Sequence, residues 1–150
     1  MGRYPTGVAI IAAQDANGKL HGLTVGSFTS ISLEPCLVGF FPGVNSASWS
    51  AMQGVSRFSV SVLSADQEAI CGAFARSGED KFANVGYTLS TLGNPLIDDA
   101  VLWIECDRHS VTEAGDHLLV MGEVQRIAAG TAKAPMIFCQ GGYPQLNIGS

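Results

Sequence analysis

Apolar and polar residues follow one another in short blocks that predict many strands and little helix. Residues 7–13 form an apolar run that is typical of a buried strand. Asn17-Gly18 comes shortly after this run, and that dipeptide favours a tight hairpin turn. We therefore expect residues 7–13 to pair antiparallel with the stretch that begins at Leu20.

The middle of the chain predicts two more strands and two helices. Residues 36–42 are almost entirely apolar and predict a third buried strand. Residues 57–63 alternate apolar residues with serines, which predicts a half-buried strand with one side facing water. A short helix is expected over residues 46–53. The S-x-x-Q capping box at Ser64–Gln67 predicts a second helix over residues 65–75.

One long hairpin is expected to dominate the last third of the chain. Residues 77–100 are punctuated by glycine, asparagine and proline, so we expect a loop there. Two long segments, residues 101–112 and 117–127, flank a turn over residues 113–116, and a short strand is expected over residues 136–140. Six or more strands with two short helices predict a mainly β, antiparallel, barrel-like fold rather than a doubly wound sheet.

Length and composition favour one domain over residues 1–150. Hydrophobic residues make up 47% of the chain and charged residues only 14%. Part of so apolar a surface is expected to be buried against a partner, most simply a second copy of the chain. The net charge is −5 and no basic cluster is present, which argues against a nucleic acid partner.

Several classes of protein are disfavoured by missing motifs. No apolar run is long enough to span a bilayer and no signal peptide is recognised, so we expect a cytoplasmic protein without a membrane partner. In that compartment the four cysteines are expected to be buried and reduced. There is no C-x-x-C, no metal-ligand spacing of histidines, no Rossmann or P-loop glycine motif and no nucleophile elbow. We therefore expect no metal site.

The stretch of residues 21–38 carries the first group of side chains suited to chemistry. Thr24, Ser27, Thr29 and Ser30 bring four hydroxyls into a run without an acid or a base. Such small neutral donors and acceptors suit a heteroatom-rich ring or a phosphate. On composition alone, an edge strand whose polar side meets water is the favoured explanation of the same pattern.

Three further segments are weaker when each is taken alone. The segment Asn45–Ser48 lies where a strand meets a helix, a place that suits either an anion or a simple helix cap formed by Asn45 or Ser46. The tripeptide Asp80–Phe82 fits a surface loop with one anchoring aromatic, and Arg76 before it suits a phosphate or carboxylate. Gly115–His117 opens a strand, and its imidazole can donate a hydrogen bond, although a lone histidine in a turn is usually just solvated.

The order of residues 21–38, H-G-L-T-V-G-S-F-T-S-I-S-L-E-P-C-L-V, resembles the flavin-binding stretch of the flavin reductase-like family. The resemblance extends from Pro5–Val8 to Tyr143 and includes the G-D-H of residues 115–117. It implies an FMN-binding split β-barrel that is usually a homodimer. It also implies a small NAD(P)H:flavin oxidoreductase that uses FMN or FAD with NADH or NADPH and supplies a monooxygenase. Family members begin with a short helix, of which residues 1–5 would be the tail.

The resemblance also assigns roles to single residues. It implies that His117 is the catalytic residue beside the nicotinamide. It places the flavin ring and phosphate against eight residues: Thr24, Val25, Gly26, Ser27, Ser30, Asn45, Ser46 and Phe82. Gly26 stands where many members have asparagine, and Asn45 stands where many have a basic residue. Two alternatives stay open: a flavin-binding electron carrier, and a split-barrel relative that binds heme or a pyridoxal-type phosphate.

Overall fold

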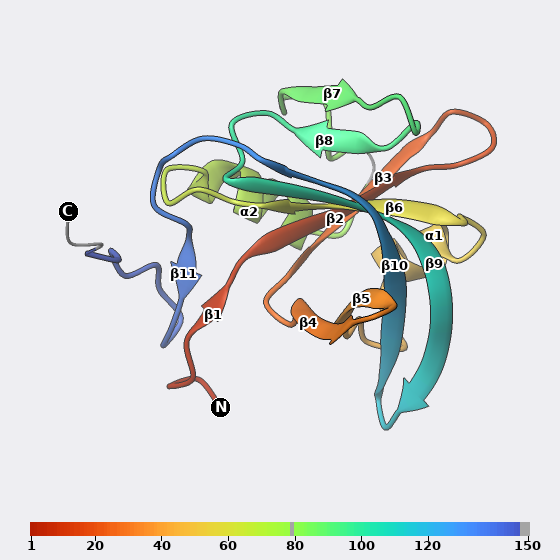
Figure 1. The fold of residues 1–150 in the computed structure, drawn as a ribbon. Coiled ribbons are helices and arrows are strands. Elements are labelled where there is room, and N and C mark those ends of the chain that lie inside the picture. The colour runs from red at the N-terminus through yellow and green to blue at the C-terminus, as the bar shows by residue number, and fades with distance from the viewer. Residues whose placement is uncertain (79, 148–150) are drawn as a thin grey trace.

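The computed structural model describes residues 1–78 and 80–147, which form a mainly β fold with two short helices (Figure 1). The strands are β1 (Thr6–Gly7), β2 (Ala9–Gln14), β3 (Leu20–Val25), β4 (Thr29–Leu33), β5 (Cys36–Phe40), β6 (Arg57–Val62), β7 (Tyr87–Leu89), β8 (Pro95–Ile97), β9 (Leu102–Ala114), β10 (His117–Ala129) and β11 (Ile137–Phe138). The helices are α1 (Ala47–Met52) and α2 (Glu68–Ala75).

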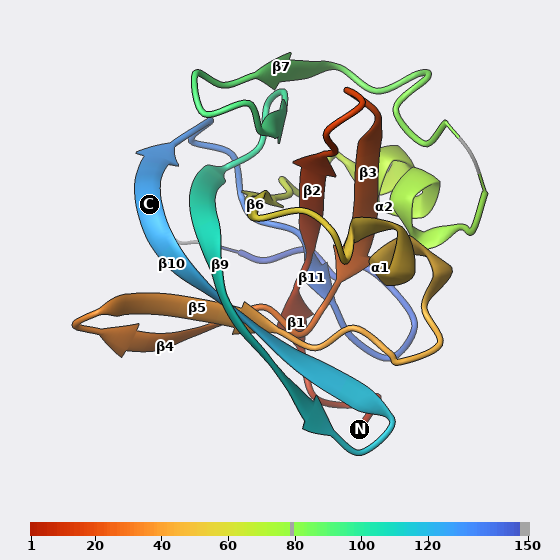
Figure 2. The ribbon, with the colours of Figure 1, turned by 90° about the vertical axis from the view of Figure 1, so that its right-hand side faces the viewer.

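Seven strands form one curved antiparallel sheet in the order β3-β2-β6-β9-β10-β5-β4. Two small sheets, β1-β11 and β7-β8, flank it. Figure 2 shows the large sheet bending so that β4 and β5 cross below β2 and β6. The arrangement confirms the mainly β, antiparallel prediction and is consistent with a split barrel. The β2–β3 and β9–β10 hairpins both form where the sequence predicts them.

Strand β2 lies at the centre of the core because both of its sides are buried. Ala9 and Ile11 belong to one apolar cluster, which also contains Phe40 and Val120. The alternate residue Ile10 belongs to a second cluster around α2. Successive side chains of a strand point to opposite sides, so a continuous apolar run is what a strand between two clusters requires.

Both helices pack on the edge strand β3, as Figure 2 shows at its right-hand side. Gly22 of β3 makes the packing of α2 possible. A Cβ at Gly22 would lie 2.6 Å from Cε1 of Phe74, which is 1% exposed. The close contact brings the last turn of α2 against the free edge of the sheet.

The predicted half-buried character of β6 is wrong. Ser59 and Ser61 are both fully buried, because the β7–β8 hairpin covers the side that the pattern assigns to water. Ser59 Oγ donates to the carbonyl oxygen of Pro95, and Ser61 Oγ accepts from the amide of Ile97 at 3.1 Å. The sequence predicts a loop over residues 77–100, so this covering hairpin was missed.

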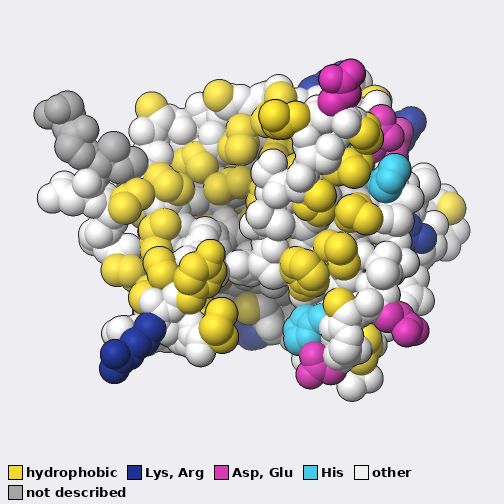
Figure 3. Space-filling view, turned by 60° about the horizontal axis from the view of Figure 1, so that its bottom comes forward, with side chains coloured by type: hydrophobic (Ala, Val, Ile, Leu, Met, Phe, Trp, Pro, Cys, Tyr) yellow, Lys and Arg dark blue, Asp and Glu magenta, His cyan; other side chains and the backbone are white. Residues whose placement is uncertain are grey.

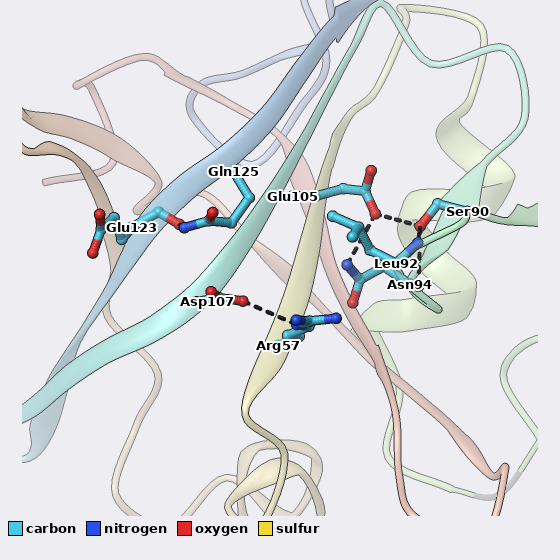
Figure 4. Close-up of polar contacts among 8 residues, drawn as sticks. All are labelled: Arg57, Ser90, Leu92, Asn94, Glu105, Asp107, Glu123 and Gln125. Carbon is cyan, nitrogen blue, oxygen red and sulfur yellow. Dashed lines mark hydrogen bonds and ion pairs between the residues drawn. The ribbon is translucent and has the colours of Figure 1, made fainter.

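The loop between β7 and β8 is fastened to the large sheet through a buried carboxylate on β9. Glu105 accepts from the hydroxyl of Ser90 and from Nδ2 of Asn94 at 2.9 Å (Figure 4). Its other oxygen lies 3.5 Å from Nη1 of Arg126. These partners satisfy a carboxylate whose side chain is only 3% exposed, as a buried charge requires.

Other boundaries differ from the prediction for local reasons. Helix α2 begins at Glu68, because Ser64 forms a β-bridge with Pro135 instead of starting a helix. Half of the predicted capping box still forms, since Oε1 of Gln67 accepts from the amide of Ser64. Residues 1–5 form a turn rather than the tail of a helix.

The four cysteines are free thiols, but they are not all buried. Cys71 and Cys106 are buried as predicted, and burial raises the pKa of Cys106 to about 12. Cys139 is half-buried, and Cys36 is exposed at the start of β5. The prediction of four buried thiols is therefore wrong for Cys36.

A substitution at Gly122 of β10 would test how closely the sheet is packed at this position. A Cβ there would lie 2.5 Å from Cζ of Phe58 and 2.7 Å from Cβ of Cys106, both of which are buried. Gly122→Ala should lower the free energy of unfolding by about 1–3 kcal/mol, because overpacking forces buried neighbours apart. Urea denaturation measures the loss. Gly54→Ala is the control, since nothing lies within 4 Å of a Cβ there, and equal losses in both variants would contradict the packing argument.

Candidate functional site

Three of the segments singled out in the sequence meet at one end of the sheet. The amide of Phe41 donates to Oγ of Ser27 at 3.0 Å, which joins the loop after β3 to the end of β5. The amide of Leu118 donates to the carbonyl of Pro42 at 2.9 Å, and that of Val44 to the carbonyl of Asp116 at 3.0 Å. Figure 2 shows the loop from β5 to α1 passing the turn of the β9–β10 hairpin. The hydroxyl stretch, the helix start and the G-D-H turn are therefore parts of one site.

His117 stands at the start of β10 with its side chain 51% exposed. Its Nδ1 lies 2.7 Å from Oδ1 of Asp116. The hydrogen bond and charge of His117 lower the pKa of Asp116. An ionised carboxylate only accepts hydrogen bonds, so Nδ1 carries the proton and Nε2 remains available for a ligand. Asp116 thus holds both the turn, through its carbonyl, and the imidazole, through its carboxylate.

The stretch 21–38 contains most of β3, all of β4 and the start of β5, and its first part is used in packing. The hydroxyl of Thr24 donates to the carbonyl of Cys71 in α2 at 2.9 Å. The side chain of Val25 is 7% exposed and belongs to the core. The side chains of these two predicted ligand residues are therefore engaged in contacts within the protein.

The second half of this stretch leaves polar groups available. Gly26 is exposed, and a Cβ there would lie 2.8 Å from Oγ1 of Thr6. That hydroxyl is buried and has no hydrogen-bond partner among the described residues. Ser27 accepts one hydrogen bond and keeps its proton to donate. Ser30 is exposed on the edge strand β4.

Ser46 is the N-cap of α1, which agrees with the helix-cap explanation of this segment. Its Oγ accepts from the amide of Trp49 at 3.2 Å. A hydroxyl that accepts one bond still has a proton to donate, so capping leaves room for an anion contact. Asn45 precedes it with an exposed side chain.

Phe82 lies apart from the loops around His117. It is 8% exposed and belongs to the apolar cluster around α2. Its ring centroid is 4.8 Å from that of Phe74 and 5.3 Å from that of Tyr87, both in edge-to-face geometry. The ring also lines a cavity of about 560 Å³ with Lys19 and Leu20. Its assignment to the flavin stays a prediction.

A second cavity, of about 260 Å³, lies between β3, α1 and the loop after α2. It is lined by His21, Gly22, Ser48 and Lys81, among others. The sequence identifies Lys81 only as part of a tripeptide, and Ser48 only as the end of the Asn45–Ser48 segment. No local pattern shows that these two residues, 33 positions apart, are in contact.

The part of the chain that the structure describes contains neither a cluster of metal ligands nor a helix able to span a membrane. No three histidine, cysteine, aspartate or glutamate side chains within residues 1–78 and 80–147 gather closely enough to hold a metal ion. None of the helices in this part of the chain is long and apolar enough to cross a membrane.

Comparison with known proteins gives consistent matches over nearly the whole chain. Residues 1–147 match the family model described as flavin reductase like domain. The chain is 46% identical over 143 residues to a flavin reductase of Pseudomonas putida, covering 95% of this chain and 84% of that protein. It is 36% identical over 143 residues to HsaB, the reductase subunit of a flavin-dependent monooxygenase of Rhodococcus jostii, covering 95% and 73%.

A solved structure gives the same picture. The NADH:FAD oxidoreductase SgcE6 of Streptomyces globisporus, in complex with NAD and FAD fragments, matches with a TM-score of 0.91 at 35% identity. The match covers 97% of this chain and 88% of that one.

Proposed function

Because the chain belongs to the flavin reductase like domain family, we propose that it reduces FMN or FAD with NADH or NADPH and supplies the reduced flavin to a separate flavin-dependent monooxygenase. The observation that carries this proposal is the meeting of residues 26–30, 41–46 and 115–117 at one site. Relatives named as monooxygenase reductase subunits support the partner.

The residues at this site fit a flavin. The ring of a flavin presents several neutral donors and acceptors, and the hydroxyls of Ser27 and Ser30 and the unpartnered hydroxyl of Thr6 match them. Because Gly26 has no Cβ, the hydroxyl of Thr6 lies directly beside the backbone at this position. When bound, the nicotinamide and the flavin supply the hydride chemistry between them, and the protein supplies binding and orientation.

His117 orients the nicotinamide in this proposal. Asp116 holds the imidazole through Nδ1, which leaves Nε2 available to contact the nicotinamide. Two backbone hydrogen bonds from the β5–α1 loop hold the turn that carries both residues. The histidine therefore acts by positioning a ring within reach of the flavin, which needs a fixed side chain and no proton transfer.

The proposal includes a homodimer formed through the face at the bottom of Figure 1. Figure 3 shows apolar side chains gathered over this face. The elements at this end carry five exposed large apolar side chains: Ile31, Leu33, Phe41, Val111 and Phe138. An exposed apolar patch of this kind is typical of an interface.

The phosphate role of Ser46 is tested with two ligands. Ser46→Ala should weaken FMN binding by roughly 1.5–3 kcal/mol, the strength of a hydrogen bond to a charged group, and should weaken riboflavin binding much less. Fluorescence titration measures both. Ser50→Ala, exposed on the same helix, is the control and should bind both ligands normally. Equal losses of FMN and riboflavin would leave Ser46 as a helix cap only.

The role of His117 is tested in single turnovers. His117→Ala should slow flavin reduction by NAD(P)H about ten-fold or more, since a misplaced nicotinamide loses its near-attack geometry. Flavin affinity, thermal stability and reduction by dithionite should stay near their parent values. The matched control is His109→Ala, an exposed histidine on the same hairpin. A parent protein that never accepts electrons from NADH or NADPH would instead be a flavin-binding carrier.

The dimer is tested at Leu33, which is 91% exposed. Leu33→Asp should raise the dimer dissociation constant at least about ten-fold, because a carboxylate in an apolar interface loses its hydration. Light scattering across a dilution series measures the effect. Leu89→Asp on β7, near the top of Figure 1, is the control. A parent chain that is monomeric at micromolar concentration would contradict the dimer.

A further inference from the structure

The hydroxyl of Ser90 connects the β7–β8 hairpin to a carboxylate buried in the large sheet. It donates its proton to Oε1 of Glu105, which also accepts from Nδ2 of Asn94 at 2.9 Å (Figure 4). The same hydroxyl accepts from the amides of Leu92 and Asn94, both at 3.2 Å. A hydroxyl has one proton and two acceptor sites, so Glu105 fixes the orientation of Ser90 and, through it, the shape of the turn after β7.

The two strands of this hairpin are held to the large sheet in different ways. Strand β8 contacts the sheet directly, since the carbonyl of Ile97 accepts from Nε1 of Trp103 at 2.7 Å and its amide donates to a serine of β6. Among the described strands, β7 pairs with β8 alone, and the turn after it is what joins it to the large sheet. Loss of the Glu105 contacts would therefore loosen β7 more than β8.

The other end of β7 contacts the loop that carries Phe82. The ring centroid of Tyr87, the first residue of β7, lies 5.3 Å from that of Phe82 in edge-to-face geometry. Phe82 packs in turn on Phe74 of α2. Tyr87 and Phe82 also line the cavity of about 560 Å³, together with Leu20 of β3. Strand β7 is thus held by Glu105 at one end and supports an aromatic residue of the predicted flavin site at the other.

The burial of a carboxylate at this contact is not explained by stability alone. The side chain of Glu105 is 3% exposed, and its cationic partner Arg126 lies 3.5 Å away and is half exposed. Apolar residues that replace such a buried pair often leave a protein equally stable. Hydrogen bonds differ from apolar contacts in being directional, because they weaken steeply when donor and acceptor are misaligned. The property that Glu105 supplies is therefore the orientation of the turn and of β7.

We propose that Glu105 is a positioning residue for flavin binding, which holds Phe82 and its loop in place through strand β7 and Tyr87. The proposal rests on the proposed flavin reductase function and on the assignment of Phe82 to the flavin site, and it deepens both. Because Glu105 is buried beneath the hairpin, it acts through β7 rather than by touching a ligand. Packed side chains and hydrogen bonds of this kind can carry energetic coupling between separate parts of a protein.

The test combines flavin binding with hydrogen exchange. Glu105→Leu removes the acceptor for Ser90 and Asn94. It should raise the dissociation constant of FMN roughly three- to thirty-fold, the range expected for a residue that acts through packed intermediates, as measured by flavin fluorescence quenching. The amides of residues 80–87 should exchange faster in this variant. Glu105→Gln keeps an oxygen that can accept both hydrogen bonds and should recover most of the affinity.

The control is Asp107→Asn, which changes a carboxylate two positions along β9. Asp107 forms an exposed pair with Arg57 (Figure 4), away from the hairpin turn, so this variant should leave the dissociation constant of FMN and the exchange of residues 80–87 unchanged. Coupling is reciprocal, so FMN should also slow amide exchange in β7 of the parent protein, and should do so less in Glu105→Leu.

Ser90→Ala keeps the proposal falsifiable if Glu105→Leu fails to fold. It removes one of the two donors from the turn, leaves Asn94 in contact with Glu105, and should weaken FMN binding by a smaller factor. Faster exchange in the turn with an unchanged dissociation constant would show that Glu105 stabilises the hairpin only, and would overturn the proposal. Reduction of FMN by NADH in the parent protein reports separately on the reductase function: its absence counts against that function, whereas its presence with unchanged FMN binding in the variants counts against Glu105 alone.

Discussion

Two backbone hydrogen bonds hold the candidate site together, from Leu118 to Pro42 and from Val44 to Asp116. They fasten the loop between β5 and α1 to the turn that carries His117. Strand β10 already pairs with β5 through Val120 and Phe40, so the loop leaves the sheet beside the turn. Backbone groups rather than side chains therefore set the distance between the helix start and the histidine. This arrangement tolerates changes of side chain, and Asn45 in place of a basic residue is one such change.

Close packing at glycines has a comparable role on the other side of the molecule. Because Gly22 has no Cβ, the ring of Phe74 lies directly on β3 and the last turn of α2 reaches the sheet edge. The ammonium of Lys81 then meets carbonyls of both elements and the hydroxyl of Ser48. A bulkier residue at position 22 would move α2 outward and separate these groups. The cavity beside Lys81 thus depends on a contact that carries no chemistry itself.

The sequence predicts the local pairings of this fold and misses those made by distant segments. Asn17-Gly18 and the G-D turn place two hairpins correctly, because a turn and its flanking strands lie within one short stretch. The alternation in β6 predicts one side exposed to water, yet Ser59 and Ser61 are buried against a hairpin whose contacting residues are 36 positions away. Hydroxyl groups satisfied by backbone atoms are as compatible with a core as with water, so periodicity alone does not distinguish the two.

The same limit applies to the site. Three of the four segments selected by motif resemblance meet in the structure, but the resemblance does not show which side chains remain available within them. Thr24 and Phe82 both belong to matching motifs, yet one bonds to α2 and the other packs between two aromatic rings. The side chain of Lys81, the residue before Phe82, points the other way. A charged group is disfavoured in the apolar cluster, so the ammonium group lies at the edge of β3, where it donates to the carbonyl of Gly22. In a tripeptide that alternates between core and surface, the buried aromatic fixes the loop, and the neighbouring cation is thereby presented to the cavity.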